Sequence, residues 1–364
     1  PGSFLIETSN LDRQIVVPAS AAQPRNMGAD LMVLSDGRWL LGYSRWLGGA
    51  HDDDGSQVCA LISEDRGDSW SCPFDIARPA DGVEAVRMPN FLRLNDGRLA
   101  CFLRVRTNHL DTWTGMLICR DEAQLGTPQD GTELWSDPIR ISPPAPGRHV
   151  LLNNRVVRLQ HGAHAGRILL PLASPWPWEE EDRRGSDIRT WVLRSDDDGQ
   201  NWRPSDSMLE GPKRGLMEPY IVEMLDGRLR MWMRTQVGRQ YESISTDGGV
   251  TWSTATAGPL VSPESPVAVA RHEASGLLMV VWNHNEPGAH TADRTPICIA
   301  FSQDEGETWF DELRLDPGDG EPKEGRSFSY PGAHFLGDTG FVTYYENAEK
   351  QLSLIQQRFE LSVT

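Results

Sequence analysis

Arginine, acidic and tyrosine residues lie near the ends of apolar, strand-like segments of this sequence. The most informative of them are Arg25, Glu218, Arg234, Arg294 and Tyr330. A guanidinium group gives a carboxylate directional, charge-assisted hydrogen bonds that a lysine does not reproduce. A tyrosine activated by a neighbouring glutamate can act as a nucleophile. If the fold brings these side chains together, their chemistry suits an acidic substrate.

A run of three aspartates adds candidates for proton transfer. The segment HDDDG at residues 51–55 contains Asp52, Asp53 and Asp54. By itself this segment is equally compatible with a charged loop and with a weak Ca²⁺ site. The histidines have no HExxH or similarly tight spacing, so the sequence predicts no zinc site. Nucleophilic and acid–base chemistry of this kind requires no cofactor.

One octapeptide pattern, Ser-x-Asp-x-Gly-x-(Ser/Thr/Asn)-Trp, recurs four times and accounts for part of the unusual tryptophan content. The aspartate can accept hydrogen bonds from turn amides, and the glycine supplies a backbone angle that other residues avoid. The tryptophan then covers the corner with a large apolar ring. A wide gap after the first copy suggests a degenerate copy between residues 119 and 136. The four copies are SEDRGDSW at 63–70, SDDDGQNW at 195–202, STDGGVTW at 245–252 and SQDEGETW at 302–309.

Glycine-centred turns between apolar runs occur six times, as in LMVL-SDGR-WLLGYS and YIVEML-DGR-LRMWM. Asp-Gly between two such runs predicts a β-hairpin. Six inner hairpins, each followed by an outer hairpin, describe six four-stranded antiparallel sheets. The sequence therefore predicts an all-β fold, a six-bladed β-propeller, formed by residues 1–364 as a single domain. Residues 4–18 are expected to close the ring with the last blade, and residues 174–189 to form an acidic surface loop.

Composition limits the partners. The chain of 364 residues has a formal net charge of −17, which argues against nucleic acid and anionic lipid. No apolar run is long enough for a membrane span. Five cysteines without a close pair favour a reducing compartment such as the cytoplasm, although Pro1-Gly2-Ser3 is compatible with a removed secretion signal. The oligomeric state is not predicted.

The octapeptides resemble the Asp boxes, or BNR repeats, of the sialidase (neuraminidase) superfamily, and the resemblance extends from about Arg25 to Arg358. It implies a six-bladed propeller with the active site on its axis. It also implies three arginines for the substrate carboxylate, here Arg25, Arg234 and Arg294. Arg25 lacks the Ile-Pro that usually follows it in this family.

The same resemblance implies Tyr330 as the nucleophile, Glu218 as its base and Asp52 as the acid/base, with Asp53 and Asp54 as alternatives. A neutral tyrosine suits this reaction because a carboxylate nucleophile would be repelled by the substrate carboxylate. Further contacts to substrate are expected from strand ends on the same rim: Arg45, Arg87, Arg104, Arg106, Asn154 and Asn283.

The resemblance implies an exo-acting glycoside hydrolase that removes a terminal acidic sugar, with sialic acid as the first choice. A polysaccharide lyase or glycosidase acting on uronate-containing glycans is the first alternative. It would keep the arginines but would not need Tyr330 to contact Glu218. A non-catalytic carbohydrate-binding propeller is the second alternative.

Overall fold

The computed structural model describes residues 4–6, 11–128, 130–178, 187–285, 294–316 and 325–363. The expected inner hairpins are confirmed, because each glycine turn joins two antiparallel strands. In the first, Leu34 and Arg38 close a turn in which Gly37 has a φ of +89°. This left-handed conformation is one that glycine adopts at little cost. The core of the expected acidic loop, residues 179–186, lies outside the described residues.

Three sheets have four antiparallel strands each. The strands of the first are β11 (Val157–Arg158), β12 (Ile168–Trp176), β13 (Asp187–Ser195) and β14 (Arg203–Pro204). Those of the second are β15 (Met217–Glu223), β16 (Leu229–Arg234), β17 (Arg239–Ser245) and β18 (Thr256–Val261). Those of the third are β19 (Ala268–Arg271), β20 (Leu278–Asn283), β21 (Ile297–Ser302) and β22 (Phe310–Asp316).

The other two sheets differ from the expected six separate units. One has eight strands, because a single parallel pair, Ser56 with Ala85, joins β5 to β7. Its strands are β3 (Asn26–Val33), β4 (Trp39–Trp46), β5 (Ser56–Ser63), β6 (Phe74–Ala77), β7 (Ala85–Arg93), β8 (Leu99–Arg106), β9 (Thr112–Ile118) and β10 (Ile139–Ile141).

The last sheet has five strands, since two N-terminal strands pair with the C-terminal one. The prediction that residues 4–18 complete the last sheet is therefore confirmed for the described part of that segment. Its strands are β1 (Phe4–Ile6), β2 (Asp12–Val17), β23 (Ser327–Leu336), β24 (Thr339–Ala348) and β25 (Gln351–Val363). In the described part of the chain, three short 3₁₀ helices lie between strands: η2 (Glu122–Gln124), η3 (Thr132–Leu134) and η4 (Gly162–His164).

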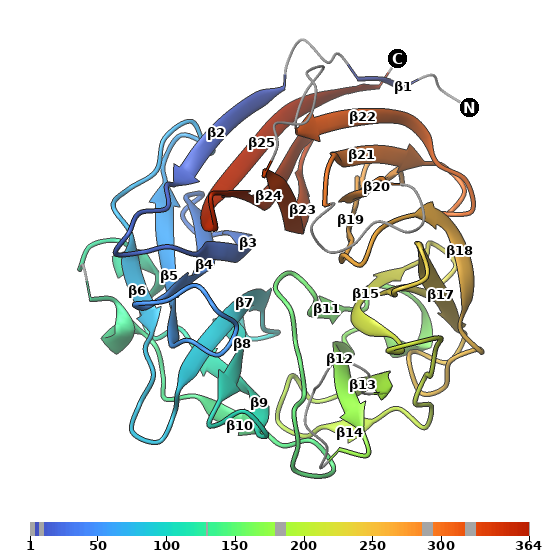
Figure 1. The fold of residues 1–364 in the computed structure, drawn as a ribbon, viewed down its shortest axis with the longest axis horizontal. Coiled ribbons are helices and arrows are strands. Elements are labelled where there is room, and N and C mark those ends of the chain that lie inside the picture. Colours follow the sequence, from blue (N-terminus) through green and yellow to red (C-terminus); the bar gives the residue numbers. More distant parts are fainter. Residues whose placement is uncertain are drawn as a thin grey trace.

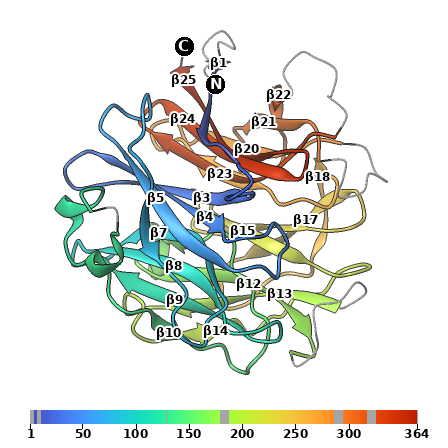
Figure 2. The ribbon, with the colours of Figure 1, turned by 60° about the vertical axis from the view of Figure 1, so that its left-hand side comes forward.

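Figure 1 shows these sheets arranged radially around a centre, as in a β-propeller. The strands β3, β7, β11, β15, β19 and β23 face the centre, and later strands of each sheet lie outside them. Figure 2 shows the same ring turned by 60° about the vertical axis. Side chains therefore meet at the centre from positions far apart in the sequence.

The four octapeptides have the same structure. In each, the serine hydroxyl accepts a hydrogen bond from the glycine amide, as in Gly306 N to Ser302 Oγ at 2.8 Å. Asp304 accepts one from Thr308 N at 2.8 Å. The degenerate segment lies at the equivalent place, between β9 and β10. These acidic residues are structural, as their turn chemistry predicts.

The octapeptide tryptophans pack between neighbouring sheets. Trp309, which precedes β22, lies 6.2 Å from the ring of Trp232 in β16. Trp202 lies 6.1 Å from Phe102 in β8, and Trp70 lies 6.3 Å from Phe341 in β24. Each of these rings thus contacts the sheet that precedes its own around the propeller. The repeats fix the position of one sheet against the next, largely by burying aromatic surface.

We predict that Asp304→Ala lowers the free energy of unfolding by about 1–2 kcal/mol at neutral pH, because the turn loses charge-assisted hydrogen bonds. Desolvation opposes ionisation of Asp304, but hydrogen bonds from Thr308 and Ser302 outweigh it and lower its pKa. The stabilisation is complete above the ordinary aspartate pKa of about 4 and is lost as the pH falls through the lower folded-state pKa. Denaturant unfolding at pH 7 and at pH 2–3 measures both effects.

The control is Glu273→Ala, an exposed site on the turn before β20, which is expected to change stability by no more than about 0.5 kcal/mol. Equal destabilisation by the two variants would contradict a special role for the octapeptide aspartate.

Candidate active site

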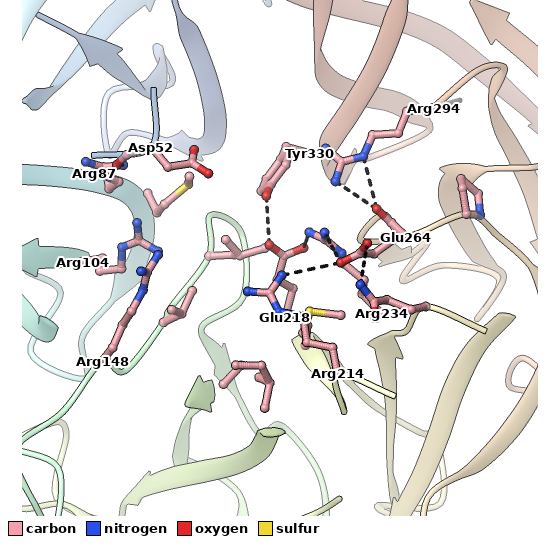
Figure 3. Close-up of a pocket in the computed structure, with 18 of the residues that line it drawn as sticks. Asp52, Arg87, Arg104, Arg148, Arg214, Glu218, Arg234, Glu264, Arg294 and Tyr330 are labelled. Atoms are coloured by element: carbon pink, nitrogen blue, oxygen red, sulfur yellow. Dashed lines mark hydrogen bonds and ion pairs between the residues drawn. The ribbon is translucent and has the colours of Figure 1, made fainter. Parts of the chain in front are cut away.

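A pocket of about 1140 Å³ opens at the centre of the ring (Figure 3). It is lined by residues from the starts of innermost strands, the ends of their neighbours and intervening loops. Among the lining residues of the described chain, eight are basic and three are acidic. The acidic ones are Asp52, Glu218 and Glu264. The pocket is therefore strongly positive, although the whole chain is acidic.

Tyr330 and Glu218 meet in this pocket from β23 and β15. The Tyr330 hydroxyl donates a hydrogen bond to Glu218 Oε1 at 2.9 Å. Arg234, at the end of β16, donates to the other carboxylate oxygen of Glu218 at 2.8 Å. Glu218 is thus held from both sides, with one oxygen against a phenol and the other against a guanidinium. This geometry suits a tyrosine nucleophile whose proton passes to glutamate.

The backbone at both residues is unusual. Glu218 has a φ of 49° and Tyr330 a φ of 56°, in the left-handed region that residues with a Cβ rarely adopt. The pairing register of the innermost strand shifts at each position, as it does at Gly28 in β3 and Met88 in β7. A β-bulge of this kind re-aims a side chain and is common beside active sites. Here it places the carboxylate and the phenol in one pocket.

Opposing electrostatic effects set the protonation of this pair. Desolvation works against ionisation of Glu218, but the positive charge and hydrogen bond of Arg234, together with Arg294, lower its pKa. Desolvation and the negative charge of Glu218 raise the pKa of Tyr330 to about 12. At neutral pH, Glu218 is therefore ionised and Tyr330 protonated, which leaves the carboxylate free to receive the phenol proton.

Arg294 completes this side of the pocket. Its guanidinium carbon lies 5.5 Å from the centre of the Tyr330 ring, and it donates to Tyr345 Oη at 3.0 Å. Glu264, which no sequence pattern indicated, orients both arginines. Its carboxylate accepts from Arg234 at 2.9 Å, and its backbone carbonyl accepts from Arg294 at 2.9 Å.

Asp52, which Figure 3 shows across the pocket from Arg234, forms an ion pair with Arg25 at 2.8 Å. Asp52 projects into the pocket and its side chain remains accessible to solvent. Desolvation opposes its ionisation, but the charge and hydrogen bond of Arg25, with the charges of Arg104 and Arg87, lower the pKa to about 2. In the empty pocket Asp52 is a carboxylate, not a proton donor.

Arg87, an expected contact, also lines the pocket. It packs against the Trp46 ring at 4.7 Å and donates to the backbone carbonyls of Asp52 and Asp54. It therefore supports the aspartate loop as well as the pocket wall.

Asp53 and Arg45 were expected at the site but do not line the pocket. Asp53 is directed to Arg106 at 3.3 Å and is largely exposed. Arg45 donates to Tyr43 Oη at 2.5 Å. Because alternate residues of a strand share a face, Arg45 lies with Tyr43 rather than with the pocket.

Asn154 and Asn283 also lie outside the lining. Asn283 donates to the backbone carbonyl of Phe328 at 2.9 Å, and Asn154 accepts from Tyr220 Oη at 3.0 Å. Both side chains thus provide hydrogen-bond partners for buried polar groups of neighbouring strands. The position of a residue at a strand end does not reveal such a role. Neither is among the described residues that line the pocket, and their roles as substrate contacts stay predictions.

Several other residues that line the pocket lie at positions that no sequence motif indicated. Arg148, Lys213 and Arg214 lie in loops between strands, and Trp46 ends β4. Arg104, near the end of β8, is an expected contact that lines the pocket. Within the described residues, no group of three or more His, Cys, Asp or Glu side chains could hold a metal ion, and none of the described helices has the length and apolar character needed to cross a membrane.

Comparisons with known proteins agree with this architecture. The structure is similar to Trypanosoma rangeli sialidase in complex with the inhibitor DANA, with a TM-score of 0.73 and 14% identity over 98% of this chain and 60% of that one. It is also similar to the NanB sialidase of Streptococcus pneumoniae, with a TM-score of 0.71 and 13% identity over 95% and 70% of the two chains. The structure is also similar to that of a protein of unknown function from Dyadobacter fermentans, with a TM-score of 0.69 and 18% identity over 98% of this chain and 99% of that one.

In sequence, 98 residues are 36% identical to an anhydrosialidase from Macrobdella decora. This match covers 26% of the chain and only 11% of that relative. Fold and repeats together define a sialidase-like propeller. Residues 43–342 match the family described as BNR repeat-like domain, and the chain belongs to that family.

We predict that Arg25→Gln raises the pKa of Asp52 from about 2 toward its ordinary value near 4, because the adjacent positive charge is removed. A titration of the carboxyl carbon of Asp52 by NMR measures the shift. Arg45→Gln, which removes an arginine outside the pocket, should leave the Asp52 titration unchanged. An Asp52 pKa that stays near 2 in Arg25→Gln would refute the assigned cause.

Proposed function

We propose that this protein is an exo-acting glycoside hydrolase that removes a terminal acidic sugar, with sialic acid as the first choice. The observation that carries the proposal is the 2.9 Å contact between Tyr330 and Glu218 beside Arg234 and Arg294. A uronate lyase would not require that contact. The sialidases of similar fold support the proposal, although low identity limits them to the fold.

In the proposed reaction, Arg25, Arg234 and Arg294 bind the substrate carboxylate through charge-assisted hydrogen bonds. The Tyr330 oxygen attacks the anomeric carbon while its proton passes to Glu218, and the bond to the leaving oxygen breaks. Asp52 gives a proton to that oxygen. Water then attacks the anomeric carbon, returns a proton to Asp52 and releases the sugar, while Tyr330 recovers its proton from Glu218.

Asp52 can act as an acid only if Arg25 releases it. In the empty pocket the ion pair keeps Asp52 ionised. A substrate carboxylate competes for the same guanidinium, and its own negative charge also opposes ionisation of Asp52. Binding of an acidic sugar therefore raises the pKa of Asp52 and prepares the proton donor.

For the architecture we infer six blades within residues 1–364, formed as one domain. The eight-stranded sheet consists of β3–β6 and β7–β10, which a single parallel residue pair connects. Counting these as two units, with the three four-stranded sheets and the five-stranded sheet, supports a six-bladed ring.

We predict that the protein releases 4-methylumbelliferone from its N-acetylneuraminic acid glycoside. Tyr330→Phe and Glu218→Gln should each lower kcat by about 100-fold or more, since each removes one partner of the proton transfer. Fluorescence reports the release. Tyr241→Phe, in β17 outside the pocket lining, is the matched control and should keep wild-type activity.

The proposal fails if no fluorophore is released, or if Tyr330→Phe is as active as wild type. A rise in ultraviolet absorbance with uronate glycans would instead identify an unsaturated product and a lyase.

A further inference from the structure

A second group of arginines lies across the pocket from Arg234 and Arg294. We call Arg87, Arg104 and Arg148 the second arginine cluster; Figure 3 shows them together beside Asp52. The three arginines assigned to the substrate carboxylate do not include them. The cluster therefore adds positive charge to the pocket beyond that needed to bind one substrate carboxylate.

The strand pairing makes this charge costly. Arg87 of β7 and Arg104 of β8 are direct cross-strand partners, and they are 1% and 7% exposed. Like charges directly opposite one another destabilise a sheet. Desolvation and repulsion by neighbouring arginines lower the pKa of Arg87 to about 8 and that of Arg104 to about 10.

Among the described residues, the negative charge of Asp52 offsets this repulsion only in part. The Arg104 side chain has no hydrogen bond or ion pair to any other described residue, and its buried Nε has no partner. Arg87 donates only to backbone carbonyls. The pocket carboxylates are engaged elsewhere, Asp52 with Arg25 and Glu218 and Glu264 with Arg234.

We propose that the second arginine cluster is a subsite for a second oxyanion group, a sulfate ester or a further carboxylate, on the same acidic glycan. The substrate class is then a dianionic glycan whose terminal carboxylate binds at Arg234 and Arg294 and whose second anionic group binds at Arg87 and Arg104. This inference rests on the proposed function, because it uses the carboxylate site assigned there. A guanidinium with unused donors gives an oxyanion charge-assisted, directional hydrogen bonds.

The test compares three non-hydrolysable, S-linked ligands by calorimetry on the full chain. They are α2,3-sialyllactose, the same trisaccharide with a 6-sulfate on galactose, and α2,8-disialyllactose with a second carboxylate. At least one dianionic ligand should bind about tenfold tighter than the first, or better, and which one does so identifies the second group. Equal affinity for all three ligands in the wild-type protein would overturn the proposal without any variant.

Arg104→Met then locates the effect. It should abolish the advantage of the dianionic ligand, measured as the ratio of its affinity to that of α2,3-sialyllactose in the same variant. It should not lower the melting temperature, because a buried like charge is removed. Arg239→Met, in β17 outside the pocket lining, is the control and should keep the advantage. An advantage that persists in Arg104→Met would refute the assignment to this cluster.

A sugar-independent measurement separates this inference from the proposed function. Potassium sulfate, compared with potassium chloride at equal ionic strength, should raise the melting temperature of the wild type more than that of Arg104→Met. If no sialic acid ligand binds but this difference is present, the proposed function fails and the oxyanion subsite stands. If sulfate has the same effect on both proteins, the subsite is refuted.

Discussion

Positive charge held at the centre of an acidic protein is the constraint on which the rest of the site depends. Eight basic side chains face a pocket to which the described residues contribute three carboxylates. Glu218 and Glu264 together hold Arg234, and Asp52 holds Arg25. Strand pairing, rather than an acidic partner, keeps Arg87 beside Arg104. At a net charge of −17 the whole surface repels an anion, but screening over about 8 Å leaves the local field to decide binding.

A rigid ring of sheets meets this constraint because no single strand could hold these groups in place. Glu218 and Tyr330 are separated by 112 residues and still meet at hydrogen-bond distance. The tryptophans that pack octapeptides against the preceding sheet fix the angular position of the inner strands. The octapeptides thus support the geometry of the pocket through the sheets that they hold against one another.

Much of the fold could be predicted because its signals are local. Asp-Gly turns such as Asp36-Gly37 specify hairpins, and the octapeptide specifies its own hydrogen bonds. The approach of Tyr330 to Glu218 could also be expected, since both head innermost strands. Their left-handed backbone could not, because residues with a Cβ adopt it only where tertiary packing requires it. The joining of β5 to β7 depends on a single residue pair and has no sequence signal. Which strand-end residues line the pocket could not be predicted, because a strand-end position indicates nearness to the rim but not the face on which a side chain lies. Arg45 therefore packs with Tyr43, and Asn283 supports the backbone at Phe328.

That charge balance also explains how one aspartate could be ionised at rest and still donate a proton. The ion pair with Arg25 holds the pKa of Asp52 near 2, so this residue carries no proton at neutral pH while the pair is intact. Under the proposed function, an incoming carboxylate would take Arg25 and add negative charge, and both changes would favour protonated Asp52. Because ligand binding and protonation are thermodynamically linked, an acidic ligand that raises the pKa of Asp52 binds together with the uptake of a proton. Under the proposed function, a neutral sugar of the same shape would leave the ion pair intact, so the pocket would select for acidic ligands in the proton transfer as well as in binding.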